Sequence, residues 1–329
     1  MKQYAIYAAL LFVLLAVVPV LTNGMHPQQA VTQEETVIRE SATARTRSDE
    51  TEDNASETIE TINVVRAASG KTETLAVTEY ILGCVAGEMA LGYHEEALKA
   101  QAVACYTYAV YRTNAGEKTI SDSSENAQAY LDLEARKKRW GDAFARNEDK
   151  LGKIVSEVRG KQILYDGKPI LAAFHSNNAG MTESALVYWG TDYPYLQSVQ
   201  SKGDRLSPDL TAVVTFSSSV MKSKLNDADG VKLGKNAIDW FGISTRSDAG
   251  TITSILVGGK ELTGVSLRTV LGLRSANFEI KYKDDTFTVT TKGLGHGVGM
   301  SQYGADFMAR QGSGYTEILE HYYTGCTVA

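Results

Sequence analysis

Glu88 is a carboxylate on the apolar side of a predicted helix. Val77, Ile81, Cys84 and Glu88 recur at helical spacing and therefore share one helix face. The neighbouring Gly87 adds no side-chain bulk, so the Glu88 carboxyl could line a groove while it stays partly desolvated. Desolvation disfavours the anion and raises the pKa of a carboxyl group, as a general acid working near neutral pH requires. A simpler interpretation also fits the spacing: the apolar stripe ends before Glu88, which then faces solvent at the helix end.

The glycine-rich segment 293–304, GLGHGVGMSQYG, is the second candidate site. Glycines at every second position would leave one face of an extended strand without side chains, which allows close approach of a ligand or of another backbone. The segment lacks the glycine spacing of a dinucleotide fingerprint, a phosphate loop or a serine-hydrolase elbow. Two interpretations stay open. The segment walls a substrate groove opposite the Glu88 helix, with His296, Gln302 or Tyr303 positioning the ligand, or its glycines only let backbones pack.

The cysteines and histidines predict neither thiol catalysis nor a metal centre. Cys84 lies inside a predicted helix, where no N-terminal dipole lowers the pKa of its thiol. We expect Cys84 and Cys105 to be buried, inert thiols, with a disulfide between their two helices as the alternative. The five histidines are too scattered along the chain for a zinc site. No metal and no cofactor is therefore predicted.

A helical hairpin and a series of β-hairpins must position these residues. Residues 72–112 show helical spacing in two runs, joined by a short link at 90–94. Asp166-Gly167 and Asp284-Asp285 are turn signals between short strands, and short helices are expected near 216–225, 265–271 and 301–311. Because the strands arrive in hairpins, the predicted fold class is α+β: a helical hairpin packed on largely antiparallel β-sheets, with a groove between two lobes.

The composition of the chain excludes several protein classes and argues against a nucleic-acid partner. The chain has 329 residues, of which 43% are hydrophobic and 22% charged, and its formal net charge is -6. These values exclude a disordered, collagenous or coiled-coil chain. No excess of Lys and Arg is available to neutralise phosphates, so nucleic acid is not an expected partner.

The N-terminal region divides the chain into three parts. Residues 4–21 carry no charge, so we expect 1–24 to be an uncleaved, single-pass membrane anchor, with a cleavable signal peptide as the alternative. Residues 31–60 hold nine acidic against three basic residues and no aromatic residue, which is typical of a flexible segment. We therefore predict an acidic tether over 25–71 and a folded domain over 72–329, on the outer face of the membrane.

Several of these segments resemble the stage II sporulation protein D family. The resemblance begins with YILGCVAGEM at 80–89 and EALKAQAVA at 96–104, and it covers nearly all of 72–328. Its most specific part is GHGVGMSQYGA at 295–305 followed by HYY at 321–323. The remaining matches are FHS at 174–176, TE at 182–183, PYL at 194–196 and LGLRS at 271–275.

The resemblance implies an activity and a set of site residues. Family members are lytic transglycosylases that act on peptidoglycan glycan strands without stem peptides, during septal wall thinning and engulfment in sporulation. Glu88 matches their catalytic acid, which would protonate the glycosidic oxygen and then, as a carboxylate, remove a proton from the primary hydroxyl of the muramyl ring. An anhydromuramyl product would form without the second carboxylate that ordinary glycosidases use. The implied substrate-binding residues are Lys99, Gln101, His175, Arg274, His296, Gln302 and Tyr303.

Partners and location are implied in the same way. The resemblance suggests cooperation with stage II sporulation proteins P and M, and a place in the mother-cell membrane with the domain facing the intermembrane space. The alternative function is a non-catalytic wall-binding module that activates a partner amidase. Some relatives bind zinc through adjacent His and Cys ahead of a Gln, but here Asn126 and Ala127 precede Gln128. Zinc is therefore not expected.

Overall fold

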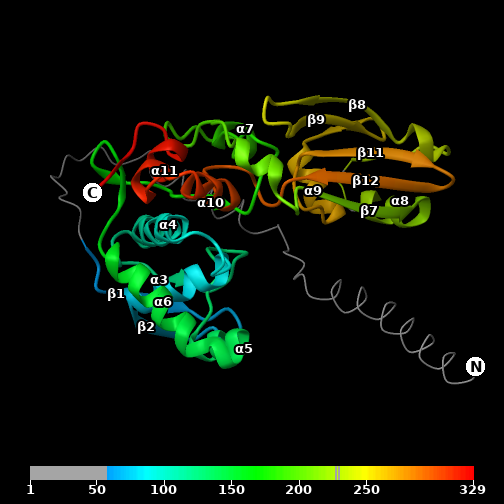
Figure 1. The fold of residues 1–329 in the computed structure, drawn as a ribbon. Helices are drawn as coiled ribbons and strands as arrows, with labels where there is room; N and C mark the ends of the chain where they lie inside the picture. Colours follow the sequence, from blue (N-terminus) through cyan, green and yellow to red (C-terminus); the bar gives the residue numbers. More distant parts are fainter. Residues whose placement is uncertain (1–57, 227, 229) are drawn as a thin grey trace, which may run out of the picture. The chain divides into compact units, whose positions relative to one another are not determined.

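The computed structural model describes residues 58–329 except 227 and 229 (Figure 1). The predicted anchor (1–24) and most of the predicted tether lie outside the described residues. Within the described part of the chain, no helix is long and apolar enough to cross a membrane. The last part of the tether prediction is wrong, because β1 (Thr61–Val65) pairs antiparallel with β2 (Thr72–Ala76). Ile62 and Val64 of β1 are buried, so the folded domain begins before residue 71.

The predicted helical hairpin is confirmed and forms the centre of a first hydrophobic core. α3 (Val77–Glu88) and α4 (Glu95–Thr113) pack against each other. The imidazole of His94 caps α4 by accepting a hydrogen bond from Glu96 N. Fully buried alanines on α4 allow close approach of α3, α6, α10 and α11. The neighbouring helices are α6 (Phe144–Glu157), α10 (Gln302–Arg310) and α11 (Tyr315–Tyr322), and α7 (Ala185–Trp189) adds buried residues to the same core.

A charged helix, α5 (Leu133–Trp140), contacts α3 and α6, and neither α5 nor α6 was predicted from the sequence. Arg136 of α5 is fully buried and pairs with Glu79 of α3 and Glu148 of α6, each at 2.8 Å. A buried cation is tolerated only when it is paired and hydrogen-bonded, and Leu131 O accepts a further bond from its Nη1. This network fastens α5 beside the hairpin.

Short strands complete the first core. The predicted turn at Asp166-Gly167 is confirmed: both residues have positive φ, and β4 (Ile163–Tyr165) pairs antiparallel with β5 (Lys168–Pro169). β14 (Thr327–Val328) adds to β4. Two pairs are parallel, namely β1 with β3 (Ile120–Ser121) and β6 (Phe174–His175) with β13 (Met300–Ser301).

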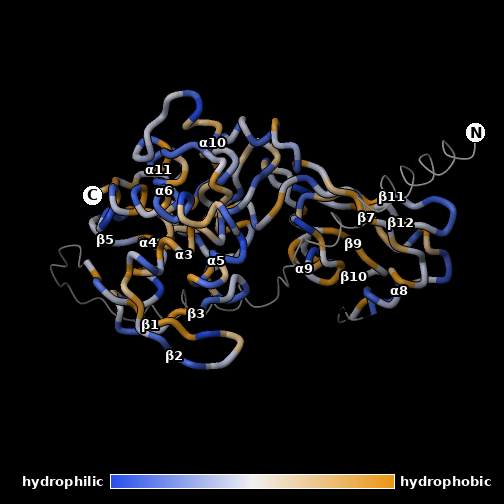
Figure 2. Tube along the Cα trace, turned by 60° about the horizontal axis from the view of Figure 1, so that its bottom comes forward, coloured by the Kyte–Doolittle hydropathy of each residue, from blue (hydrophilic) through white to orange (hydrophobic). Residues whose placement is uncertain are grey.

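A second hydrophobic core lies between two antiparallel sheets and two short helices. One sheet has the order β11-β12-β7 and the other β10-β9-β8. Hydrophobic residues gather around α3 and α4 in the first core and around β9 and β10 in the second (Figure 2). The elements are β7 (Thr211–Ser217), α8 (Ser218–Asn226), β8 (Phe241–Arg246), β9 (Ile252–Val257), β10 (Lys260–Leu262), α9 (Gly264–Leu271), β11 (Phe278–Lys283) and β12 (Thr286–Lys292).

The turn predicted at Asp284-Asp285 joins β11 to β12, and both residues have positive φ, as tight hairpin turns require. The expected short helices correspond to α8, α9 and α10. The chain is therefore an α+β protein whose strand pairing is mainly antiparallel, as the sequence predicts.

Candidate active site

Glu88 is the last residue of α3, and two segments distant in sequence hold its half-buried carboxyl group. Oε1 accepts a hydrogen bond of 2.6 Å from Ala129 N, and Oε2 accepts a longer one of 3.4 Å from Gln302 Nε2. A Cβ on the adjacent Gly87 would lie 3.1 Å from Ala129, so a glycine lets this backbone approach the helix. The carboxyl is thus oriented by its neighbours, and it is not a solvent-facing group at a free helix end.

The environment of Glu88 favours its neutral form. Burial raises the pKa of Glu88 to about 7, against the opposing effect of the hydrogen bonds from Ala129 and Gln302. Near neutral pH the group is therefore divided between acid and carboxylate. The same carboxyl can donate a proton in one step and accept one in the next.

The structure brings Gln101 and Gln302 to Glu88. Gln302 begins α10, and its Nε2 also lies 3.4 Å from Oε1 of Gln101. Gln101 is fully buried and donates to Cys105 Sγ at 3.2 Å. Gln101 therefore holds Gln302 in place from within the core, whereas Gln302 contacts the candidate acid itself.

A buried carboxylate that the sequence analysis missed fixes the start of α10. Ser301 caps this helix, and its Oγ donates to Oδ1 of Asp204 at 2.7 Å. Asn178 N donates to the same oxygen at 3.1 Å, and Ser201 donates to the other. Burial raises the pKa of Asp204 to about 6, although all three hydrogen bonds favour its anion. No sequence motif marks Asp204; the only signal is its place three residues after Ser201.

The glycine-rich segment is not an extended strand with a bare face, so that prediction is wrong. Gly293, Gly295, Gly297 and Gly299 all have positive φ, and only β13 pairs as a strand in this region. A Cβ on Gly299 would lie 2.0 Å from Ala173 O. Cβ atoms on Gly293 and Gly295 would each lie 2.9 Å from residues 175–177. These three glycines serve backbone packing, as the alternative interpretation expects.

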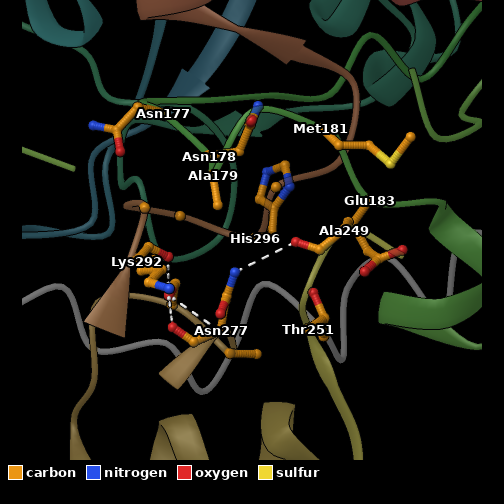
Figure 3. A pocket seen from close by; sticks show the side chains of 15 residues that line it. Asn177, Asn178, Ala179, Met181, Glu183, Ala249, Thr251, Asn277, Lys292 and His296 are labelled. Atoms are coloured by element: carbon orange, nitrogen blue, oxygen red, sulfur yellow. Dashed lines mark hydrogen bonds between the residues drawn. The ribbon is translucent and has the colours of Figure 1, made fainter. Parts of the chain in front are cut away.

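Gly297 differs from the other three, because a Cβ at this position would lie 3.6 Å from its nearest neighbour, Glu183 Cβ. It lines a pocket together with His296, Asn277 and Thr251 (Figure 3). The other lining residues come from segments 177–183, 249–251, 275–277 and 292–295. Glu88 is not among its lining residues, so this pocket is not the groove predicted opposite the Glu88 helix.

Both histidines of this region are neutral and packed. His175 is buried, with Nδ1 3.1 Å from Val298 O and Nε2 3.0 Å from Asn178 Nδ2, and burial lowers its pKa to about 4. Burial also lowers the pKa of His296, whose ring lies 5.1 Å from that of Trp189 and whose Nδ1 accepts from Val298 N. His175 supports the glycine-rich segment from behind, and His296 faces the pocket.

Three other predicted site residues are not hydrogen-bonded to Glu88 or its two glutamine neighbours. Lys99 forms ion pairs with Glu96 and Glu157, and it lies two positions before Gln101, on the opposite side of α4. The remaining two contact backbone carbonyls: Arg274 Nη2 donates to Asp209 O and Tyr303 Oη donates to Leu206 O.

The cysteines match the sequence analysis. Cys84 and Cys105 are free, buried thiols, so the disulfide alternative is wrong. Burial raises the pKa of the Cys84 thiol well above its usual range, which makes it unreactive. Over 58–329, leaving aside 227 and 229, no group of three or more His, Cys, Asp or Glu side chains is placed to hold a metal ion.

Comparison with known proteins identifies the family. A model described as stage II sporulation protein matches residues 66–165. The chain is 40% identical to stage II sporulation protein D of Bacillus amyloliquefaciens, over 82% of this chain and 78% of that protein. It is 36% identical to stage II sporulation protein D of Bacillus subtilis (strain 168), over 100% of this chain and 96% of that protein. The chain belongs to the stage II sporulation protein D family.

Family membership places the chain among sporulation proteins and confirms the resemblance predicted from the sequence. A more distant relative is the amidase enhancer of Bacillus subtilis (strain 168), which is 29% identical over 75% of this chain and 40% of that protein. The family model matches residues 66–165, and this range includes Glu88, Gln101 and Ala129.

Proposed function

We propose that the chain is a lytic transglycosylase that cleaves peptide-free glycan strands of peptidoglycan during septal wall thinning and engulfment. The observation that carries the proposal is the half-buried carboxyl of Glu88, whose pKa is raised to about 7 and whose two oxygens have different partners. A general acid for glycoside cleavage needs both a raised pKa and a defined orientation.

The two oxygens of the Glu88 carboxyl group have different roles in this reaction. Oε1 is occupied by the short hydrogen bond from Ala129 N, so the acidic proton belongs on Oε2, where the Gln302 contact is longer. From Oε2 the proton passes to the glycosidic oxygen, and the bond to the muramyl anomeric carbon breaks. The carboxylate left behind then removes the proton of the primary hydroxyl of the same ring. That hydroxyl oxygen bonds to the anomeric carbon, which closes the anhydro ring without consuming water.

The surroundings of Glu88 favour this route over hydrolysis. Retaining and inverting glycosidases use a second carboxylate, at about 5–5.5 Å or about 6.5–9.5 Å from the first. A second ionised carboxylate that close would raise the pKa of Glu88 by repulsion. The pKa of Glu88 responds instead to burial and to two hydrogen bonds, with no contribution from another carboxylate among the described residues.

Mass analysis of the products tests the reaction type. The full-length chain is incubated with glycan strands from which an amidase has removed the stem peptides, in water enriched in ¹⁸O. We expect products that end in anhydromuramyl residues without the label. Reducing ends that carry ¹⁸O would show hydrolysis and would contradict the proposal.

A second candidate function is activation of a partner amidase. One observation favours it: a relative that is 29% identical over 75% of this chain carries the name amidase enhancer. We propose stage II sporulation proteins P and M as the partners, and a single-pass location in the mother-cell membrane with the domain in the intermembrane space. The two functions are compatible. Amidase activity measured with the parent chain and with Glu88→Gln separates them, because activation that needs no proton transfer survives the substitution.

A further inference from the structure

Three cationic side chains hydrogen-bond backbone carbonyls around the end of α3, the helix that carries Glu88. Arg139 Nη1 donates to Ala86 O at 2.9 Å, Lys150 Nζ to Leu91 O at 3.2 Å, and Arg310 Nη2 to Gly92 O at 3.0 Å. Carbonyls at a helix end lack intrahelical partners, and cations there also interact favourably with the helix dipole. These bonds therefore stabilise the backbone on both sides of Glu88.

Two of these three cations have no acidic partner among the described residues. Arg310 is paired with Asp306 Oδ2 at 2.7 Å, whereas Arg139 and Lys150 form no ion pair in that part of the chain. On the same two helices Lys137 pairs with Glu134 and Lys153 with Asp149, whereas the exposed Lys138 and Arg146 also form no ion pair among the described residues. Positive charge on α5 and α6, whose side chains reach the backbone around the end of α3, is thus left unneutralised in a protein with a net charge of -6.

Arg139 has the donors to bind an anion in addition to its structural contact. A guanidinium carries five N–H donors, and Arg139 uses one of them on Ala86 O. The side chain is exposed, so the remaining donors face solvent. Fork-shaped guanidinium donors match the two oxygens of a carboxylate. The neutral, protonated form of Glu88 would not repel such an anion.

The proposed substrate carries a suitable anion. Each muramyl ring bears a lactyl group, and the stem peptide is joined to the lactyl carboxyl through an amide bond. Removing the peptide by amide hydrolysis leaves a free carboxylate at that position. Peptide-free strands are therefore anionic polymers with one carboxylate for each muramyl ring, whereas peptide-bearing strands have a neutral amide at the same point.

We propose that Arg139, supported by Lys150, binds the lactyl carboxylate of a muramyl ring and so selects strands without stem peptides. This inference rests on the proposed function, because it gives the reason for the choice of substrate at the same site. Arg139 is a specificity-determining residue in this arrangement, and it takes no part in proton transfer.

Equilibrium binding to two matched strands tests the assignment. One probe is peptide-free glycan with free lactyl carboxylates, and the other is the same glycan with those carboxylates converted to neutral methyl amides. All chains are full length and carry Glu88→Gln, so that no probe is cleaved. Adding Arg139→Gln is expected to weaken binding of the carboxylate probe about tenfold and to leave the amide probe unchanged, because one charge-assisted contact is lost. Arg139→Lys should recover part of the loss.

Lys137→Gln is the matched control, since it removes one positive charge two positions earlier on α5, on the opposite side of that helix. It should leave both affinities unchanged.

Equal affinity of the Arg139→Gln chain and its parent for the carboxylate probe would overturn the inference. An equal loss of affinity for both probes would also overturn it, because such a loss marks a purely structural contact. Product analysis with the parent chain judges the proposed function separately: strand cleavage without a role for Arg139 defeats only this inference. If Arg139 selects the carboxylate probe but the parent chain cleaves neither strand, only the proposed transglycosylase function is contradicted.

Discussion

The Glu88 site and the pocket at His296 use polar residues in opposite ways. At Glu88, burial raises the pKa of a carboxyl to about 7, which leaves a group able to exchange a proton near neutral pH. At and behind the pocket, burial lowers the pKa of His175 to about 4 and also lowers the pKa of His296, which leaves both rings uncharged. The same physical effect thus produces an acid–base group in one region and inert packing in the other. We therefore propose that proton transfer takes place at Glu88 and that the pocket at His296 contributes only its shape.

Replacing the acid should have the largest effect. Glu88→Gln keeps the size of the side chain and the hydrogen-bond geometry at Oε1 but removes the transferable proton. We expect glycan cleavage to fall about a thousandfold or more, within the range for loss of general acid catalysis. Turnover of peptide-free strands is the measurement, and an unchanged circular dichroism spectrum is the control for folding. Cleavage at the parental rate by a folded variant would move the chemistry away from Glu88.

Substitutions at two glycines of segment 293–304 should distinguish a glycine needed for backbone packing from one that lines the pocket. A Cβ at Gly299 would lie 2.0 Å from Ala173 O, so Gly299→Ala should cost about 3 kcal/mol or more in the free energy of unfolding. At Gly297 the nearest atom is 3.6 Å away, so Gly297→Ala should cost only the strain of positive φ, about 1–2 kcal/mol.

Denaturant unfolding of both variants measures this difference, and Gly297→Val adds a test of the pocket. If the pocket binds glycan, Gly297→Val should weaken strand binding in a chain that is still folded. Parental affinity of the folded variant would assign Gly297 to packing with the other three glycines.

Activity should follow the titration of Glu88. Because the acid must be protonated in the free enzyme, kcat/KM should fall about tenfold for each pH unit above 7.

The contribution of Glu88 to the free energy of unfolding should also fall as the pH rises. The folded-state pKa lies above the ordinary 4.5, so this contribution to stability is fully present below pH 4.5 and is lost as the pH rises through 7. Thermal unfolding of the parent and of Glu88→Gln between pH 4 and 9 checks the second point; parallel curves would contradict the raised pKa.

Local patterns predicted the parts of the fold that local interactions determine. The stripe that ends in Glu88 and the hairpin turns at 166–167 and 284–285 depend on neighbouring residues alone. β1 was missed because its short alternating pattern follows an acidic stretch, and α5 because most of its residues are charged. The ion pairs that fasten α5 join Arg136 to residues 57 and 12 positions away, which no local pattern reveals.

At the candidate site, too, local sequence patterns did not reveal contacts between residues far apart in the chain. Spacing and resemblance pointed to Glu88 and Gln302, but the two groups that hydrogen-bond the Glu88 carboxyl lie 41 and 214 positions from it. Asp204 was missed because its role is a contact with Ser301, 97 positions away. The glycine-rich segment was assigned the wrong conformation, because a spacing of two is compatible both with a strand and with a chain of positive-φ turns.

The smallest effect is expected at Lys99, which the resemblance assigned to substrate binding and the structure places away from both regions. Its ammonium group forms ion pairs with Glu96 at 2.8 Å and Glu157 at 2.7 Å, both on partly exposed side chains. Surface ion pairs contribute about 0–1 kcal/mol, so Lys99→Gln should lower the free energy of unfolding by no more than that. Strand cleavage should change less than about twofold, because the substitution removes no contact of Glu88, Gln101 or Gln302. A large loss of strand affinity with unchanged stability would instead make Lys99 part of the binding surface, and would extend the charged region beside α3 to the far side of α4.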